Sequence, residues 1–467
     1  MVFSSLNFIF VFLPLLLIVY MAVSKKYKNL VLLIAGLIFY AWGEPVYLWV
    51  MLVSSLVDFS AGIYIGKSDN QKKRRLVLIL SMIVDLGFLF VFKYSGFAVR
   101  TFNSIFGSDI TPPDLPLPIG ISFYTFQSMS YTIDVYLKKV KTQKNFINYL
   151  TYVSLFPQLV AGPIVRYDDV AEEIESRSVN ADKFGEGAGY FIKGLGKKVL
   201  LANNVGMLWT SIKGMDLSEI SVLTAWLGIL AYTFQIYYDF SGYSDMAIGL
   251  GKMFGFDFPV NFDHPYQSAS ITEFWRRWHI TLGAWFRTYV YIPLGGNRKG
   301  KFKMYRNLAI VWLLTGFWHG ASFNFIIWGA FYGFLIIIEK AGFLKILEKM
   351  PLIVSRVYTF VLVMIGWVFF DTENLSQAGQ YLKAMFAGNG LSDSLSLYQL
   401  RSYIIILLIC AVGSTELLKK TAGKISGIKK TEKASCLLVP VLQICIFLLC
   451  VCFLVDPSYN PFLYFRF

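Results

Sequence analysis

Apolar runs near the length of a membrane-spanning helix recur along this 467-residue chain. A helix needs roughly 20 predominantly apolar residues to cross the hydrocarbon core of a bilayer. The chain is 56% hydrophobic and 15% charged, which is far less charge than a soluble protein carries. The sequence therefore predicts an all-α, polytopic membrane protein. The apolar runs include Leu30–Tyr40, Val46–Ile65, Leu76–Phe92, Val222–Phe240, Phe323–Ile338, Ile353–Phe370, Tyr403–Leu418 and Cys436–Val455.

Lysine and arginine gather in short loops between these runs. The formal net charge is +14, but loops poor in positive charge, such as Lys93–Pro118 and Asp371–Arg401, alternate with the basic ones. This alternation is typical of the positive-inside rule and not of a nucleic-acid-binding surface. We therefore expect a lipid bilayer around the chain, no nucleic acid partner, and the basic loops in the cytoplasm. These loops are Lys25–Lys28, Lys67–Arg75, Lys138–Lys144, Arg298–Arg306 and Lys419–Lys433.

The order of these segments predicts about eleven transmembrane helices in one membrane domain over residues 1–467. Phe3–Tyr20 lacks a basic leader and a small-residue cleavage site, so we expect a retained first helix with its N-terminus outside. The last helix then leaves Asp456–Phe467 outside. Prolines, glycines and charges interrupt the middle third, which predicts re-entrant or tilted helices around a central tunnel. The interrupted segments are Phe146–Ile164, Phe184–Trp209 and Phe274–Ile292.

The five cysteines all lie in or beside the last two apolar segments. At such positions cysteine behaves as a small hydrophobic residue. Their spacing indicates neither external disulfides nor a zinc site, so we predict no metal. The five are Cys410, Cys436, Cys445, Cys450 and Cys452.

The apolar block Leu308–Ile338 has Gly320 near its middle. Two helices of about sixteen residues would each rise roughly 24 Å, so we predict a hairpin with His319 at its bend. An ionisable side chain at membrane depth is costly and is a functional candidate by default. Imidazole also moves protons near neutral pH. We therefore take His319 as the first catalytic candidate and His279 as the second. The alternative for each is a core histidine satisfied by one neighbour.

Polar side chains cluster within Gln235–Asp245, around a flexible Gly242. A solvated loop end explains this pattern, and so does the wall of a polar cavity. An apolar run, Met246–Gly251, follows at once, which favours the cavity wall. The residues of this predicted wall are Asp239, Ser241, Tyr243 and Asp245.

Tryptophan, arginine and other aromatic residues alternate along Phe274–Leu294. One interpretation is a basic amphipathic helix at the membrane interface, with its arginines reaching toward the headgroups. The other is that Arg276, Arg277 and Arg287 bind the phosphates of an anionic donor. Both interpretations stay open at this point.

Several of these stretches together resemble the membrane-bound O-acyltransferase family, in its bacterial polysaccharide branch. They extend from the first third of the chain to its last residue. The stretches are Pro118–Phe123, Phe156–Ile164, Tyr237–Asp245, Phe274–Tyr291, Trp318–Gly320 and Pro461–Phe467.

This resemblance implies that His319 is the catalytic histidine, that His279 occupies a second polar position, and that a tunnel crosses the protein. It implies no bound cofactor and a cytoplasmic thioester, acetyl-CoA, as donor substrate. The acyl group would serve O-acetylation of an extracellular polysaccharide or of peptidoglycan, with the chain in a bacterial plasma membrane. A related branch transfers D-alanine to teichoic acids, and the sequence does not separate these branches.

We expect His319 to act as general base toward an acceptor hydroxyl. A polysaccharide is too large for a narrow path through the membrane, so the acyl group needs a relay to an extracytoplasmic partner, which in the related systems is an SGNH-type esterase or transferase. Tyr464 in the aromatic tail is a candidate relay nucleophile, and its alternative role is an interfacial anchor. A transporter or flippase without bond making is the competing class. Transporters often repeat their halves, and we find no internal repeat.

Overall fold

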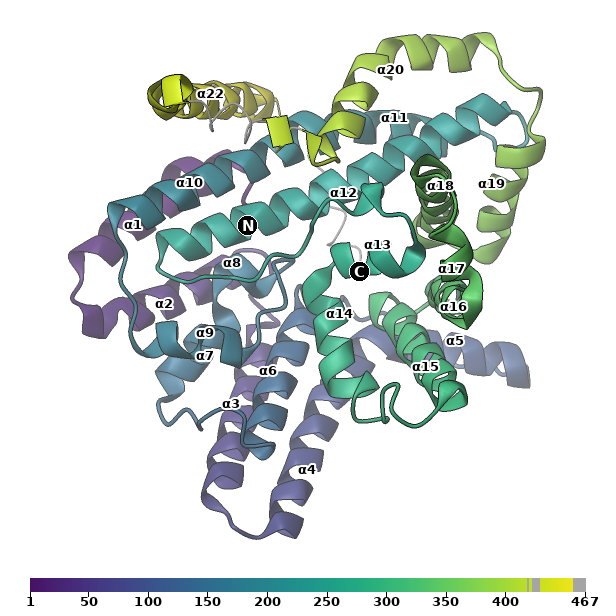
Figure 1. Ribbon diagram of the computed structural model, residues 1–467. Helices are drawn as coiled ribbons and strands as arrows, with labels where there is room; N and C mark the ends of the chain where they lie inside the picture. Colours follow the sequence, from purple (N-terminus) through teal and green to yellow (C-terminus); the bar gives the residue numbers. More distant parts are fainter. Residues whose placement is uncertain (418–419, 422–428, 457–467) are drawn as a thin grey trace. The chain divides into compact units, whose positions relative to one another are not determined.

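The computed structural model describes residues 1–417, 420–421 and 429–456. In this part of the chain all regular structure is helical and there is no strand (Figure 1), which confirms the all-α prediction. The Cα positions group into two compact units. Unit 1 comprises residues 1–191 and 244–259, and unit 2 comprises residues 192–243 and 260–467. The prediction of one domain over the whole chain stays a prediction.

Unit 1 is built mainly from the helices of the N-terminal third. They are η1 Phe8–Phe12, α1 Leu13–Ala22, η2 Lys25–Tyr27, α2 Lys28–Ala41, α3 Leu48–Lys67, α4 Gln71–Leu89, η3 Phe90–Tyr94, α5 Ser95–Phe106, α6 Ile121–Tyr136, α7 Phe146–Ser154, α8 Phe156–Leu159 and α9 Tyr167–Glu175.

Two helices, α10 Ala181–Gly196 and α12 Val222–Met253, contribute residues to both units. The other helices belong to unit 2. They are η4 Lys197–Ala202, α11 Asn203–Lys213, η5 Pro265–Gln267, α13 Ile271–Arg277, α14 Ile280–Phe286, η6 Arg287–Tyr291, α15 Lys301–His319, α16 Phe323–Ile338, η7 Glu339–Phe343, α17 Leu344–Leu347, α18 Leu352–Asp371, α19 Leu375–Ala387, α20 Ser394–Gly413 and α22 Lys429–Val455.

Five helical segments among the described residues are long and apolar enough to cross a membrane. A shorter apolar helix, Phe8–Ala22, corresponds to the expected first crossing. The total of about eleven crossings stays a prediction. The five segments are Leu48–Lys67, Gln71–Phe106, Leu352–Asp371, Ser394–Gly413 and Leu438–Val455.

The predicted hairpin is present, with α15 ending at His319 and α16 beginning three residues after Gly320. The two helices pack closely because Gly316 faces Gly329. A Cβ added at Gly316 would overlap the carbonyl oxygen of Phe325 and lie 3.1 Å from the Gly329 Cα. Small residues that let two backbones approach are a common device of membrane helix pairs. This contact sets the position of the helix end that carries His319.

The interrupted segments of the middle third are broken where the sequence predicts. Phe146–Ile164 divides into α7 and α8, and Phe184–Trp209 passes from α10 through the π-helix η4 into α11. The expectation of one amphipathic helix over Phe274–Leu294 is wrong, because α13 and α14 are separated at Trp278 and His279. His279 adopts φ 45° and ψ 52°, in the left-handed region, and this conformation ends one helix before the next begins.

Candidate functional site

His319 is the last residue of α15, and its side chain is 3% exposed. Its ring centroid lies 4.9 Å from that of Trp328 on α16 and 5.3 Å from that of Phe370 on α18. The ring of the preceding residue, Trp318, lies 5.0 Å away. The hairpin and α18 thus enclose the imidazole in an aromatic surround that excludes water, and electrostatic interactions are stronger in such a place than in solvent.

His279 is 1% exposed, and Asn261 holds its ring. The Nδ1 of His279 lies 3.1 Å from the Asn261 Oδ1. That same atom accepts hydrogen bonds from the Thr281 backbone N–H at 3.2 Å and from the Thr281 hydroxyl at 2.9 Å. The Asn261 atom accepts from an N–H group, so it must be the amide oxygen and not the amide nitrogen. An oxygen without a hydrogen can only accept, so the Nδ1 of His279 carries the proton of the neutral ring and donates it. The lone pair is therefore on Nε2.

The Nε2 atom of His279 is buried and has no hydrogen-bond partner among the described residues. A buried acceptor without a partner is costly in a folded protein and calls for an explanation. In unit 2 this nitrogen is available to accept a proton or a hydrogen bond from a substrate.

The rings of His319 and His279 both pack against the ring of Trp318. Its ring centroid is 5.0 Å from the His319 ring and 6.3 Å from the His279 ring. Phe240 of α12 lies on His279 as well, with the ring centroids 4.8 Å apart and the planes nearly perpendicular. The structure therefore brings both predicted catalytic candidates to one aromatic centre in unit 2.

The predicted polar wall lies inside α12, which is continuous over 32 residues. The alternative of a solvated loop end is therefore wrong. Gly242 is a close-approach position and not a flexible hinge, since an added Cβ would lie 2.8 Å from the carbonyl oxygen of Gly194. Asp239, Ser241 and Tyr243 are buried, whereas Asp245 is half-buried and belongs to unit 1.

Two lysines of the π-helix η4 reach these polar residues. Lys198 Nζ lies 2.5 Å from an oxygen of Asp239, and the two side chains are 2% and 1% exposed. Lys197 Nζ donates to the Ser241 hydroxyl at 3.4 Å. A π-helical turn adds one residue to the repeat, and such turns are frequent at functional sites. The sequence did not predict this buried ion pair.

Arg277 lies among three carboxylates on the surface of unit 2. It bonds to Glu273 at 3.0 Å and lies 3.5 Å and 3.6 Å from Asp263 and Glu416. A hydrogen bond from Lys420 holds the pKa of Glu416 below its ordinary value.

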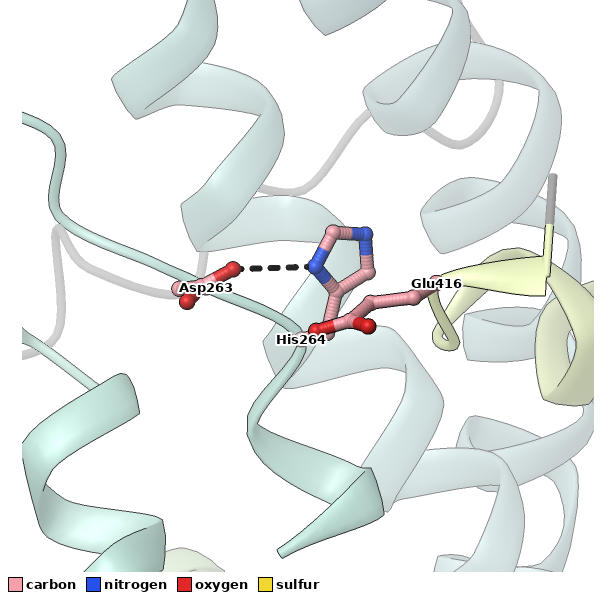
Figure 2. A group of neighbouring side chains, drawn as sticks. All are labelled: Asp263, His264 and Glu416. Atoms are coloured by element: carbon pink, nitrogen blue, oxygen red, sulfur yellow. Dashed lines mark hydrogen bonds and ion pairs between the residues drawn. The ribbon is translucent and has the colours of Figure 1, made fainter. Parts of the chain in front are cut away.

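Figure 2 shows Asp263, His264 and Glu416 together, with the Asp263 carboxylate 3.1 Å from the His264 Nδ1. The ligand atoms of these three side chains lie within 4.8 Å of one another, a spacing that a metal ion could use. Arg277 already supplies positive charge to both carboxylates. The cluster ties the loop before α13 to the end of α20.

Arg276 and Arg287 are exposed. Arg276 lines a pocket of about 440 Å³ between α13 and the segment from α17 to the start of α18. Glu273 and Glu348 line the same pocket, so its charge is mixed. Phosphate binding by the three arginines stays a prediction. Tyr464 lies outside the described residues.

Glu339 is a residue of this region that sequence reasoning missed. It is 1% exposed, and its two carboxylate oxygens accept from the backbone N–H groups of Ile271 and Thr272 at 2.7 Å and 2.8 Å. A carboxylate at a helix N-terminus satisfies unpaired donors and complements the helix dipole. Glu339 thus holds the start of α13, the helix that leads to His279. Asn261 was missed too, because nothing in its local sequence indicates that it will meet a ring beyond α13.

Comparison with known proteins shows which family the chain belongs to. Residues 34–370 match the sequence profile of MBOAT, the membrane-bound O-acyltransferase family. The chain is 41% identical to the probable alginate O-acetylase AlgI of Pseudomonas putida over 100% of both chains. It is 46% identical to the protein of that name from Pseudomonas syringae pv. tomato, over 83% of this chain and 75% of that one. It is also 36% identical to the peptidoglycan O-acetyltransferase of Helicobacter pylori, over 84% and 81% of the two chains.

The matched residues include His279, His319 and the whole of α12. The family profile covers well over half of the chain, and the first of these relatives is matched from end to end. The chain is an O-acyltransferase of the membrane, and it belongs to the membrane-bound O-acyltransferase family.

Proposed function

We propose that this enzyme transfers acetyl groups from a cytoplasmic thioester, acetyl-CoA, for O-acetylation of an exopolysaccharide or of peptidoglycan outside a bacterial plasma membrane. The observation that carries the proposal is the pair of buried histidines that meet at Trp318. The names of the relatives, which record O-acetylation of alginate and of peptidoglycan, support the choice of acyl group and acceptor.

In this mechanism the acyl carbon forms a bond to the acceptor oxygen and loses its bond to sulfur. His319 takes the proton of the acceptor hydroxyl as the oxygen attacks the thioester carbonyl. The imidazolium then returns that proton to the departing thiolate, so CoA leaves as the thiol. General-base catalysis of this kind contributes about 10²- to 10⁴-fold. His279 orients the reactants through its Nε2 atom, which Asn261 leaves free of the ring proton.

The donor's phosphates are held by Arg276, Arg277 and Arg287, which can each make charge-assisted hydrogen bonds. The C-terminus lies outside, where Tyr464 supplies the acceptor hydroxyl of this step and becomes acylated. A hydroxyl of an extracytoplasmic SGNH-type partner then attacks that ester, and the tyrosine oxygen leaves with the proton of the attacking hydroxyl. That partner completes transfer to a polysaccharide that is too large to enter the membrane-embedded site.

The test is an assay of the purified protein in vesicles with acetyl-CoA that carries a radiolabelled acetyl group. Mannuronate oligosaccharides and peptidoglycan fragments are supplied as acceptors in separate reactions. We expect free CoA and label on the protein or on one acceptor. Uptake of label without release of CoA would identify a transporter instead. If the protein uses a D-alanyl carrier-protein thioester in place of acetyl-CoA, its function is that of the teichoic acid branch.

A further inference from the structure

Two carboxyl groups face each other among the helices of unit 1, and neither has a part in the proposed acyl transfer. Asp58 on α3 is 0% exposed, and Asp85 on α4 is 1% exposed. Ser54, one turn before Asp58 on α3, donates its hydroxyl to Asp85 on α4 at 2.7 Å, so the two carboxyl groups lie at the same level of the two helices and face each other. Figure 1 shows α3 and α4 as neighbouring antiparallel helices, and α6 packs against both.

Asp58 lies near the middle of a membrane-capable helix. It is ten residues from Leu48 and nine from Lys67, the two ends of α3. At the usual helical rise these distances are about 15 Å and 14 Å, so the carboxyl group lies near half the depth of a hydrocarbon core of about 30 Å. A carboxylate at this depth is costly unless a cation or a proton neutralises it.

The described residues provide no cation for this pair. No lysine, arginine or histidine among them forms an ion pair with Asp58 or Asp85. The titratable groups that face the carboxyls from the surrounding helices are phenols, which are neutral near pH 7. They are Tyr124 and Tyr131 on α6 and Tyr149 on α7.

In each of the two aspartates, Oδ1 accepts a hydrogen bond from a hydroxyl of the described residues and Oδ2 does not. The Ser54 hydroxyl donates to Asp85 Oδ1 at 2.7 Å, and the Thr132 hydroxyl donates to Asp58 Oδ1 at 3.1 Å. Oδ2 of each aspartate is buried without a hydrogen-bond partner among the described residues.

Two further hydroxyls lie at the same place. The Ser128 Oγ and the Tyr149 Oη, both on residues that are 0% exposed, lack hydrogen-bond partners in the described part of the chain. Both are neighbours of Asp58. Buried polar atoms without partners call for an explanation.

We propose that Asp58 and Asp85 form a proton-binding site that holds one proton between the two carboxyl groups. Two carboxylates in contact cannot both be ionised in a buried, apolar place, and one shared proton removes a charge and forms the missing hydrogen bond between them. The remaining negative charge is spread over the pair and is stabilised by the hydrogen bonds that the hydroxyls of Ser54 and Thr132 donate. A bare Ca²⁺ or Mg²⁺ ion takes about six or more oxygen ligands, which is more than the two free carboxylate oxygens and the hydroxyls of Ser128 and Tyr149 supply.

The site is tested by infrared spectroscopy of the full-length protein in vesicles, in the region where protonated carboxylic acids absorb. We expect an acid carbonyl band at neutral pH that shifts in D₂O and also shifts when the aspartates carry ¹³C. The band should disappear in the double variant Asp58→Asn/Asp85→Asn. These measurements on the unchanged protein do not depend on whether the variant folds.

Asp257→Asn is the matched control. Asp257 also belongs to unit 1, and it bonds to Lys183 at 2.7 Å and to Lys252 at 3.1 Å. Burial acts to raise the pKa of Asp257, but these bonds outweigh it and hold the pKa below its ordinary value. The control should therefore keep the acid band unchanged.

Absence of an aspartic acid band from the wild-type protein at neutral pH overturns the proposal. So does survival of the band in a folded double variant. Saturable binding of ²²Na⁺ that the double variant loses, without an acid band in the wild type, would make this a cation site and would equally refute the proton. The acetyl-CoA assay is independent of all these outcomes.

Discussion

Asn261 accepts the ring N–H of His279 at 3.1 Å, and this single contact decides which nitrogen of the imidazole can take part in chemistry. The Asn261 backbone is fixed too, because its carbonyl accepts from the Ile280 N–H at 3.0 Å. Two hydrogen bonds from Thr281 hold the amide oxygen in place. The loop at Asn261 therefore locks both the tautomer and the orientation of His279.

We predict that Asn261→Ala lowers kcat by about 10- to 100-fold, the loss seen when a metal-binding histidine is deprived of the partner that orients it. Asn261→Asp keeps an oxygen that can accept from the Nδ1 of His279, but its negative charge favours the protonated form of that ring. Its pH–rate profile should therefore show an acidic limb at higher pH than the wild type. Steady-state CoA release measured across pH checks both variants. Identical profiles for Asn261→Asp and the wild type would refute the role given to His279.

His319→Ala should lower acetyl transfer by about 10²- to 10⁴-fold or abolish it, because it removes the proposed general base. His279→Ala should lower it less, since water can replace part of an orienting role. His264→Ala is the control, because the third histidine lies at the surface cluster of Figure 2. Expression and membrane insertion are measured in parallel. Near wild-type turnover in a well-inserted His319→Ala protein would exclude it as the base.

Asp239→Asn should destabilise the protein by about 3–5 kcal/mol, because it removes the carboxylate beside a buried ammonium. The charge of Lys198 would remain in an apolar place. Thermal unfolding in detergent measures the change. Adding Lys198→Met should recover most of the loss. The more exposed ion pair between Lys183 and Asp257 is the comparison. Asp257→Asn should lower the free energy of unfolding by no more than about 1 kcal/mol. Equal effects at the two positions would contradict the burial argument.

Gly316→Ala should reduce both stability and turnover. The new Cβ would overlap the Phe325 carbonyl oxygen, so α15 and α16 must separate and His319 must move. Gly379→Ala on α19 is the control, because an added Cβ there meets no atom within 4 Å. Alanine favours helix over glycine by about 1 kcal/mol, so the control should be neutral or stabilising. Thermal unfolding and CoA release distinguish the two variants.

The orientation of the chain can be checked by cysteine labelling on a background without the native cysteines. Residues in Lys67–Arg75, Arg298–Arg306 and Lys419–Lys433 should react only after the membrane is permeabilised. Residues in Ser104–Asp114 and Ser392–Ser396 should react from outside. The reverse pattern would overturn the charge-based topology and the proposed direction of acetyl transfer.

Much of the fold could be predicted from hydropathy and charge along the chain. The predicted apolar run Phe323–Ile338 has the same first and last residues as α16. Gly320 lies at the predicted turn of the hairpin. These features are local: a run of apolar side chains forms a helix at membrane depth because its backbone groups must pair within the segment. The same reasoning singled out His279 and His319, since ionisable groups are rare in such segments.

Tertiary structure alone decided which side chains meet. The carboxamide of Asn261 lies against His279, the ammonium of Lys198 against Asp239, and the carboxyl of Asp58 against Asp85. Each pair joins two elements, and hydropathy says which face of a helix is buried but not which residue of another element lies opposite. That match depends on how closely the backbones pack and where the helices break. Hydropathy, charge and motifs therefore predict a membrane acyltransferase with two candidate histidines. Packing between elements settles which ring nitrogen of His279 is available and which buried charges are paired.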